Sequence, residues 1–406
     1  MRIVKLIFEI EIIKSCFFLL LIIIIGLFGN IINLAVFKQK SMRKNSTFKY
    51  LFYLSIIDIL VLLICATDSL MTNGNIFSIR LLSNLACKCK YFIDYFLTHL
   101  SSILIMIVSI DRAIIICRQS NLIVLIRKYP FFNLFKKVHK MILIIAVLIA
   151  CLNLHFLIFM KLNRLDMEKN LIKQNHSDSS VDYLDKDEEA TLKYGFSILK
   201  LVKNQFNTDR NEISTNTNAN QIFVCYPKKV DLYYFYLSNI WIWLDIGVYS
   251  IIPFIVMSVC SLIIVKDIRR KSSAFIKTNK YNKNVAIMKI CRKSRKRNNH
   301  LLMMLLFTNL FFIICSMPLC SSLVYYRYKD EQEETHSVQS IFHLLAYSNN
   351  SFNFVFYYIF SCKYRQTLSK LLFFRPFNNL DVKSLELNQN NADVINLKNL
   401  SRSQQE

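Results

Sequence analysis

Glycine and proline are scarce in this sequence, with 5 of each among 406 residues, while hydrophobic residues make up 54% of the chain. The apolar residues gather into long runs. The run from Phe17 to Phe37 has no charged residue and reaches the roughly 20 residues with which a helix crosses a membrane core about 30 Å thick. This composition is typical of an integral membrane protein.

The first run also lacks the marks of a cleaved secretory signal. The apolar part of such a signal is about 7 to 15 residues long, and small residues follow it at the cleavage site. Neither condition holds around Phe17–Phe37. We therefore expect an uncleaved first span, preceded by an extracellular amino-terminal segment, residues 1–16.

Further apolar runs predict an all-α membrane fold, a bundle of seven transmembrane helices. The predicted spans are Phe17–Phe37, Tyr50–Leu70, Tyr91–Cys117, Val138–Met160, Tyr233–Val265, His300–Tyr325 and Val338–Ser361. Polar residues within the spans should face the bundle interior. The sequence shows no internal repeat, which counts against a transporter built from duplicated halves.

Acidic residues are outnumbered, 27 Asp and Glu against 51 Lys and Arg, which gives a formal net charge of +24. In a soluble protein this excess would suggest a nucleic-acid partner, but in a membrane protein basic loops mark the cytoplasmic side. Basic residues follow the first, third and fifth spans, most densely in loop 266–297, whereas Asp330 to Glu334 after the sixth span are mainly acidic. We therefore expect a multi-pass plasma-membrane protein with an extracellular amino terminus, lipid headgroups against its basic loop, no nucleic acid, and a disordered cytoplasmic tail, 375–406.

The segment 161–231, between the fourth and fifth spans, is polar and contains no predicted span. We expect it to be a long extracellular loop. Asn175-His176-Ser177 is a glycosylation acceptor on that side, and an acidic patch runs from Asp182 to Glu189. Two other such triplets, at Asn45 and Asn399, fall on the predicted cytoplasmic side.

Helix geometry brings four polar or charged residues of the third span together. Cys87, Asp94 and Ser101 are spaced by seven residues, and Arg112 lies eighteen residues after Asp94, which is five turns of a 3.6-residue helix. All four should lie near one face. We expect that face to line the bundle interior, with Cys87 at the outer rim and Arg112 at the cytoplasmic rim.

Single polar landmarks occur in a characteristic order along the spans. They are Gly29-Asn30, Leu54-Ser55-Ile56-Ile57-Asp58, Asp111-Arg112, Cys315-Ser316-Met317-Pro318 and Asn353-Phe354-Val355-Phe356-Tyr357, followed by a basic, aromatic stretch from Tyr364-Arg365 to Phe374. From about Phe17 to Phe374 the chain thereby resembles the rhodopsin-like (class A) G-protein-coupled receptors, most closely the invertebrate neuropeptide receptors. The resemblance implies a short amphipathic eighth helix at the membrane surface after the seventh span.

The sequence departs from the family pattern at several positions. Ala113 replaces the tyrosine after Asp111-Arg112, Ser316 replaces a tryptophan, Phe354 replaces a proline, Ser261 stands where a fifth-span tyrosine is usual, and the fourth span has no tryptophan. A proline in a helix frees a backbone carbonyl and opens a hinge. We therefore expect Phe354 to stiffen the seventh helix.

The resemblance implies roles for particular residues. Cys87 should form a disulfide with Cys225, with Cys89 as a rival for the same partner. A sodium ion should bind near Asp58, a carboxylate in mid-membrane that is costly unless paired or hydrated. The implied switch residues are Asp111, Arg112, Phe312, Pro318, Asn353 and Tyr357, and the implied sodium ligands are Asp58, Ser101, Asn349 and Asn353.

Three residues are candidates for ligand binding. In receptors for amines and some peptides, an Asp and a Tyr at the positions of Asp94 and Tyr347 hold a ligand cation, and Asp245 adds a second acid. Two acids predict a basic ligand. The long acidic outer loop favours a peptide over a biogenic amine, as do Leu319 and Cys320 where amine receptors carry a Phe pair.

The sequence thus predicts a receptor that passes an extracellular peptide or amine signal to a heterotrimeric G protein. A transporter or channel, with Asp58, Asp94 and Asp245 along its path, is the main alternative. A metal-dependent membrane enzyme is disfavoured because no two histidines are spaced as ligands on one helix turn. We expect no catalytic activity and no cofactor beyond the sodium ion.

Overall fold

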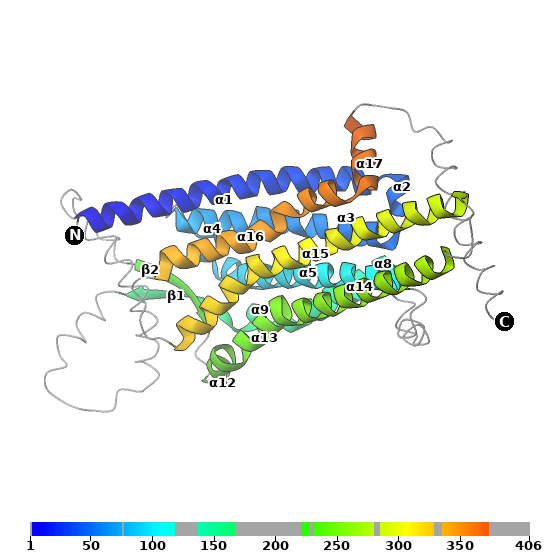
Figure 1. Cartoon of the computed structure of the whole chain (residues 1–406). Coiled ribbons are helices and arrows are strands. Elements are labelled where there is room, and N and C mark those ends of the chain that lie inside the picture. The colour runs from blue at the N-terminus through cyan, green and yellow to red at the C-terminus, as the bar shows by residue number, and fades with distance from the viewer. Residues whose placement is uncertain are drawn as a thin grey trace.

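Long helices lie side by side and form the body of the protein (Figure 1). The computed structural model describes residues 2–74, 77–117, 137–166, 221–227, 231–279, 285–328 and 335–372. Four spans are single helices: α1 (Arg2–Phe37), α5 (Asn84–Ile116), α15 (Val285–Tyr328) and α16 (Thr335–Phe360). The second span joins α3 (Ser46–Leu60), the π-helix η1 (Val61–Ala66) and α4 (Thr67–Asn73), and the fourth joins α8 (Val138–Asn153) and α9 (His155–Phe159).

The fifth span is the least regular. It comprises α12 (Asp231–Phe235), η3 (Tyr236–Trp241), α13 (Ile242–Ile246), η4 (Gly247–Ile251) and α14 (Ile252–Asn279), and both η segments are π-helical turns. Pro253 lies just after η4 and cannot donate a backbone hydrogen bond, which fits a local widening of the helix there.

Within the described part of the chain, six helical segments are long and apolar enough to cross a membrane, judged by length and composition. They are Ile13–Phe37, Ser46–Asn73, Asn84–Ile115, Val138–Phe159, Asn239–Asp267 and Leu306–Tyr325. The seventh predicted span, α16, packs against both α1 and α15 within the bundle (Figure 1). Its polar residues are buried, as expected in a bundle interior: Ser348, Asn349, Asn350, Ser351 and Asn353. The fold is the seven-helix bundle that the sequence predicts.

The helices are longer than the apolar runs predict. α14 continues to Asn279 and α15 begins at Val285, so most of residues 266–297, expected as a loop, are helical. α1 likewise begins at Arg2, within the segment 1–16 to which we assigned no helix. The cause lies in the scarcity noted above: no Gly or Pro stands between Pro253 and Pro318, and Lys and Arg are good helix formers.

The expected long loop 161–231 contains two short strands near its ends, which the sequence did not predict. β1 (Met160–Asp166) pairs antiparallel with β2 (Gln221–Pro227), and Leu162 lies opposite Cys225. β-branched and aromatic residues in β2 favour a strand. The two strands lie at the end of the bundle where α1 starts, which we call the hairpin end (Figure 1).

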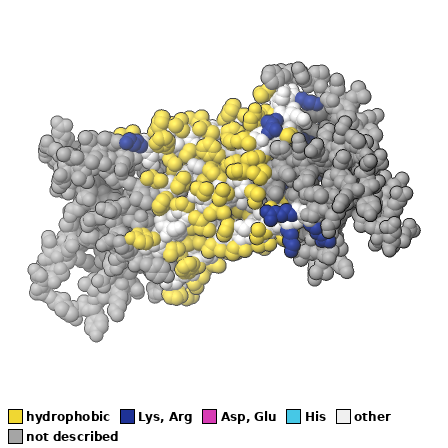
Figure 2. Space-filling view, viewed as in Figure 1, with side chains coloured by type: hydrophobic (Ala, Val, Ile, Leu, Met, Phe, Trp, Pro, Cys, Tyr) yellow, Lys and Arg dark blue, Asp and Glu magenta, His cyan; other side chains and the backbone are white. Residues whose placement is uncertain are grey.

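Two short helices mark the opposite end. α2 (Lys40–Arg43) connects the first two spans, and α17 (Cys362–Leu372) follows α16 and runs across the bundle direction (Figure 1). α17 is the eighth helix that the sequence predicts, and it buries Tyr364 and Thr367. Figure 2 shows an apolar band across the visible face of the bundle, with most of the visible Lys and Arg side chains beyond it toward this α17 end.

Candidate functional site

A disulfide between Cys87 and Cys225 attaches the strand pair to α5, with the two Cα atoms 5.8 Å apart. Cys89 is a free thiol, so Cys87 is the residue that pairs. The backbone N–H of Leu162 also donates to the Asn84 side chain at 3.0 Å. The strands are therefore held over the first turns of α5.

Four charged residues meet beneath this cover, and we call them the ion cluster: Asp68, Arg80, Lys90 and Asp94. The Lys90 ammonium lies 2.5 Å from Asp94 Oδ1 and 3.1 Å from Asp68 Oδ2. The Arg80 guanidinium lies 3.5 Å from Asp94 and 3.8 Å from Asp68. Two acids and two bases compensate each other in a region where an unpaired charge would be costly.

Members of the ion cluster differ in their access to solvent. Lys90 and Asp68 side chains are only 3% and 2% exposed, whereas Asp94 is 20% and Arg80 38% exposed. Asp94, predicted as the anchor for a ligand cation, is thus already in contact with two cations of the chain. Tyr347, its predicted companion, shares a hydrogen bond with Ser69 at 2.9 Å. Arg80 and Asp94 are therefore the more exposed members of the ion cluster.

Asp245 belongs to a second polar group, which joins the third, fourth and fifth spans. Its Oδ1 lies 2.8 Å from Nε2 of His99, and the other ring nitrogen of His99 lies 3.3 Å from the Asn153 amide nitrogen. His99 is fully buried and Asp245 is 16% exposed. Tyr95 and Trp241 lie beside this group, with Tyr95 5.9 Å from His99 between ring centroids and 5.5 Å from Trp241.

Asp58 lies at the centre of the bundle and is fully buried. Ser101 and Asn350 both donate to its Oδ1 at 2.8 Å, and Asn353 donates to Oδ2 at 3.0 Å. Asn350 makes this contact, while its neighbour Asn349, the predicted ion ligand, is also buried. The second, third and seventh spans therefore meet around one carboxylate.

A series of side-chain hydrogen bonds runs from this centre toward α17. Asn30 donates to the backbone carbonyl of Asn350 at 2.9 Å, and Asn33 donates to Asn30 at 3.4 Å. The Tyr364 hydroxyl donates to Asn33 at 2.7 Å. Burial raises the pKa of Tyr364, so its hydroxyl stays protonated and remains a donor. α17 is thereby connected to the polar interior.

The end of α5 places Asp111 and Arg112 at the α17 end. Asp111 accepts hydrogen bonds from Ser46 at 2.8 Å and from Thr47, both in the first turn of α3. Arg112 is 1% exposed, and its guanidinium carbon lies 5.2 Å from the centre of the Phe48 ring. Both residues are packed against α3 and are almost completely buried.

The remaining predicted switch residues lie on α15 and α16. Phe312 is buried beside Tyr249, with ring centroids 6.4 Å apart, and Pro318 lies within α15. Ser316, which replaces the family's tryptophan, donates to the Phe312 carbonyl at 2.7 Å. Tyr357 packs edge-on against Phe37 at 5.6 Å between centroids.

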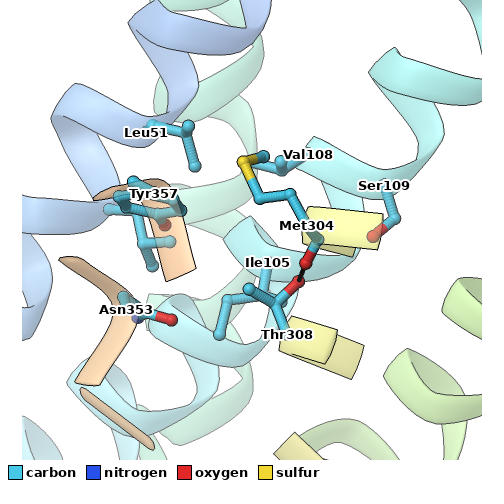
Figure 3. A pocket seen from close by; sticks show the side chains of 9 residues that line it. Leu51, Ile105, Val108, Ser109, Met304, Thr308, Asn353 and Tyr357 are labelled. Atoms are coloured by element: carbon cyan, nitrogen blue, oxygen red, sulfur yellow. Dashed lines mark hydrogen bonds between the residues drawn. The ribbon is translucent and has the colours of Figure 1, made fainter. Parts of the chain in front are cut away.

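A small cavity of about 10 Å³ opens between the second, third, sixth and seventh spans (Figure 3). Asn353 and Tyr357 point into it from α16, Met304 and Thr308 line it from α15, and Ser109 lines it from α5. Its volume is close to that of a single water probe.

Some predicted sites lie outside the described residues, and some residues of the polar groups described above were not predicted. Asn175, the acidic patch Asp182–Glu189 and the tail 375–406 lie outside the described residues. Sequence reasoning did not assign Asp68, Arg80, Lys90, His99 or Asn33. The spacing of four residues between Lys90 and Asp94 on one helix was a usable signal, because such pairs face each other.

Comparison with known proteins gives one family match. The model of the seven-transmembrane receptor family, rhodopsin family, matches residues 191–357. The described part of this range covers β2 and the fifth, sixth and most of the seventh spans. No curated protein sequence matches the chain.

Proposed function

We propose that this chain, which belongs to the rhodopsin family of seven-transmembrane receptors, binds a basic peptide at its hairpin end and activates a heterotrimeric G protein at its α17 end. Members of this family are receptors for extracellular signals and not enzymes. The hairpin end is then extracellular, and the protein acts at the plasma membrane.

The observation that carries the ligand proposal is the pair of partly exposed acids, Asp94 and Asp245, on facing spans below the strand pair. Arg80 contacts Asp94 from 3.5 Å and is the most exposed member of the ion cluster, so a ligand guanidinium or ammonium could replace it at Asp94. Lys90 lies 2.5 Å from Asp94 and 3.1 Å from Asp68, so Asp68 can keep Lys90 paired when a ligand cation binds Asp94. A peptide with a basic residue supplies such a cation, and its other residues could contact the long outer loop.

A biogenic amine is the second candidate ligand, because a single ammonium would satisfy the same acids. The aromatic rings of Tyr95 and Trp241 beside Asp245 favour it. A transporter, the third candidate, would pass a substrate without exchanging nucleotide on a G protein. Both alternatives are separated from the peptide receptor by the experiment that follows.

The test expresses the full chain in cells with a panel of chimeric G proteins and screens basic and amidated peptides beside biogenic amines by calcium release. Asp94→Asn should raise the half-maximal peptide concentration by about 10- to 100-fold, because a charge-assisted contact is lost. Asp68→Asn is the matched control, since it removes an acid from the same ion cluster at a position that is 2% exposed. It should lower the surface amount of receptor but leave potency within about threefold.

The outcomes separate the claims. A potency loss in Asp94→Asn alone supports the anchor, whereas equal losses in both variants assign Asp94 a structural role. Arg112→Ala should abolish calcium release without changing peptide binding at the cell surface. If no ligand gives a signal although the protein reaches the surface and nucleotide exchange stays at background, the receptor proposal fails and transport assays decide.

We also propose a sodium ion as an allosteric ligand near Asp58. The donor set suits a hard cation, because Asp58, Ser101 and the Asn350 and Asn353 amides offer oxygen atoms around one buried carboxylate. Both amides now direct nitrogen toward Asp58, so an ion would require them to turn their oxygens inward. Asn349 is close enough in sequence to take part.

A further inference from the structure

Ser261 and Asn309 form a buried contact between α14 and α15 that the predicted switch does not include. The Asn309 amide nitrogen donates to Ser261 Oγ at 2.9 Å and to the Met257 carbonyl at 3.3 Å. Ser261 itself donates to the same carbonyl at 2.8 Å. Asn309 and Ser261 are each 6% exposed. Ser261 is the residue that departs from the family's fifth-span tyrosine.

The same amide also reaches α5. Ser109, which is 2% exposed, donates to the Asn309 side-chain oxygen at 3.4 Å. Asn309 therefore uses both its nitrogen and its oxygen, and it bonds to two neighbouring spans. We call Ser109, Met257, Ser261 and Asn309 the Asn309 cluster.

A small cavity also borders α15 at this level, and Ser109 of the Asn309 cluster lines it as well. There Met304 and Thr308 of α15 face the small cavity that Asn353 and Tyr357 border from α16 (Figure 3). Side chains next to a void lose dispersion contacts on that side. At this level α15 is bonded to α14 and α5 through the Asn309 side chain, and its Met304 and Thr308 side chains border the cavity.

We propose that Asn309 sets the resting position of α15, as a positioning residue for signalling. When the part of α15 that leads to the α17 end moves away from α5 and α14, the Asn309 amide loses its partners inside a membrane. Unsatisfied amides are costly there, so the hydrogen bonds stabilise the resting state relative to the moved state. This inference rests on the proposed function, because the displacement of α15 is taken to admit the G protein.

The experiment compares Asn309→Leu, which keeps the branching and the heavy-atom count of the side chain but removes both hydrogen-bonding groups, with Thr308→Val. Thr308 is the matched control because it is adjacent and buried, and its hydroxyl donates to Met304 of its own helix at 3.0 Å. Two readouts are taken from each purified variant. One is agonist-independent nucleotide exchange on a G protein. The other is the distance between nitroxides on keto amino acids at Arg269 of α14 and Met303 of α15, which leaves the native cysteines unlabelled.

Asn309→Leu should increase the fraction of molecules with a longer nitroxide distance about three- to tenfold, and basal exchange by a similar factor, while Thr308→Val stays at the wild-type level. Ser261→Ala should give a smaller increase, because the Met257 carbonyl still accepts from Asn309. Adding Ser261→Ala to Asn309→Leu should change little further, since the two substitutions remove the same contact.

Each result has a distinct meaning. Unchanged distances in Asn309→Leu, in a protein that elutes as a folded monomer, overturn the inference even if wild-type receptor activates a G protein. A longer distance without any exchange, in wild type or variant, keeps the role of Asn309 and contradicts the G-protein proposal. An equal response of Thr308→Val assigns the effect to general loosening of α15 and also overturns the inference.

Discussion

Asp58 illustrates what a single buried carboxylate requires inside a membrane. Three side chains donate to its two oxygens, and two of the donors are amides that could present oxygen instead. The arrangement satisfies the carboxylate without an ion and could accommodate one after the amides rotate. The effect of a cation on the stability of the protein can therefore be measured with and without the Asp58 carboxylate.

Sodium should raise the melting temperature of the purified receptor by a few degrees relative to choline at equal ionic strength, because a ligand that binds only the folded state stabilises it. Asp58→Asn should remove this difference, since a neutral amide holds a cation poorly. Asp68→Asn, which changes another buried acid, should keep it. Equal sodium effects in all three proteins, or none in wild type, would contradict the proposed site.

A charged residue within an apolar run could be recognised from the sequence, whereas residues that meet only through the packing of several spans could not. Asp58 is a charged residue in an apolar run, and in the structure the predicted neighbours Ser101 and Asn353 donate hydrogen bonds to it. Asp94 was also recognised, but its partners Lys90 and Arg80 were not, because their meeting depends on how spans pack.

Among the elements, α1 and α16 approach each other closely at a glycine. A Cβ atom on Gly29 would overlap the Phe354 ring, so this ring lies against the bare backbone of α1. Phe354 stands where the family has a proline, and α16 runs unbroken from Thr335 to Phe360. The substitution thus gives both a continuous seventh helix, as the sequence predicts, and a contact surface for the first.

Gly29→Ala should destabilise the folded receptor by about 1–3 kcal/mol, because the added methyl group overpacks the contact with Phe354. The temperature at which half of the detergent-solubilised protein stays monodisperse measures this. Gly247→Ala is the matched control: its Cβ meets nothing within 4 Å, so the change should be neutral or mildly stabilising. Combining Gly29→Ala with Phe354→Ala should cost less than the sum of the two single losses. If the stability losses of the two single variants simply add, the Phe354 ring is not what limits the size of the side chain at position 29.

The existence of each membrane span could be predicted from apolar runs, but not the ends of its helices. The apolar runs end at the membrane surface, so they do not mark where a helix ends. α14 and α15 extend beyond these runs because residues 254–317 contain no Gly or Pro. The strands β1 and β2 escaped prediction for another reason. Their pairing joins segments on either side of a long polar insertion, and such a contact has no local signal.

The whole molecule is asymmetric along the bundle direction. The strand pair and its disulfide lie at one end, and α2 and α17 lie at the other, where most of the visible basic side chains gather (Figures 1 and 2). Basic residues near a membrane favour the cytoplasmic face, and disulfides form on the oxidising side. The two arguments are independent, and both support the proposal that the hairpin end lies outside the cell.

Glycosylation gives the decisive test of this orientation, because the chain carries acceptor triplets on both predicted sides. Asn175 should carry a glycan, whereas Asn45 should not. The Asn45 side chain accepts a hydrogen bond from the Thr47 backbone N–H at 3.2 Å and caps the start of α3, at the α17 end. Treatment with a glycosidase should increase the gel mobility of wild type and of Asn45→Gln, and Asn175→Gln should already run at the faster position. A glycan that is lost in Asn45→Gln and kept in Asn175→Gln would invert the molecule in the membrane. It would then exclude Asp94 as an extracellular anchor and Arg112 as a contact for a cytoplasmic G protein.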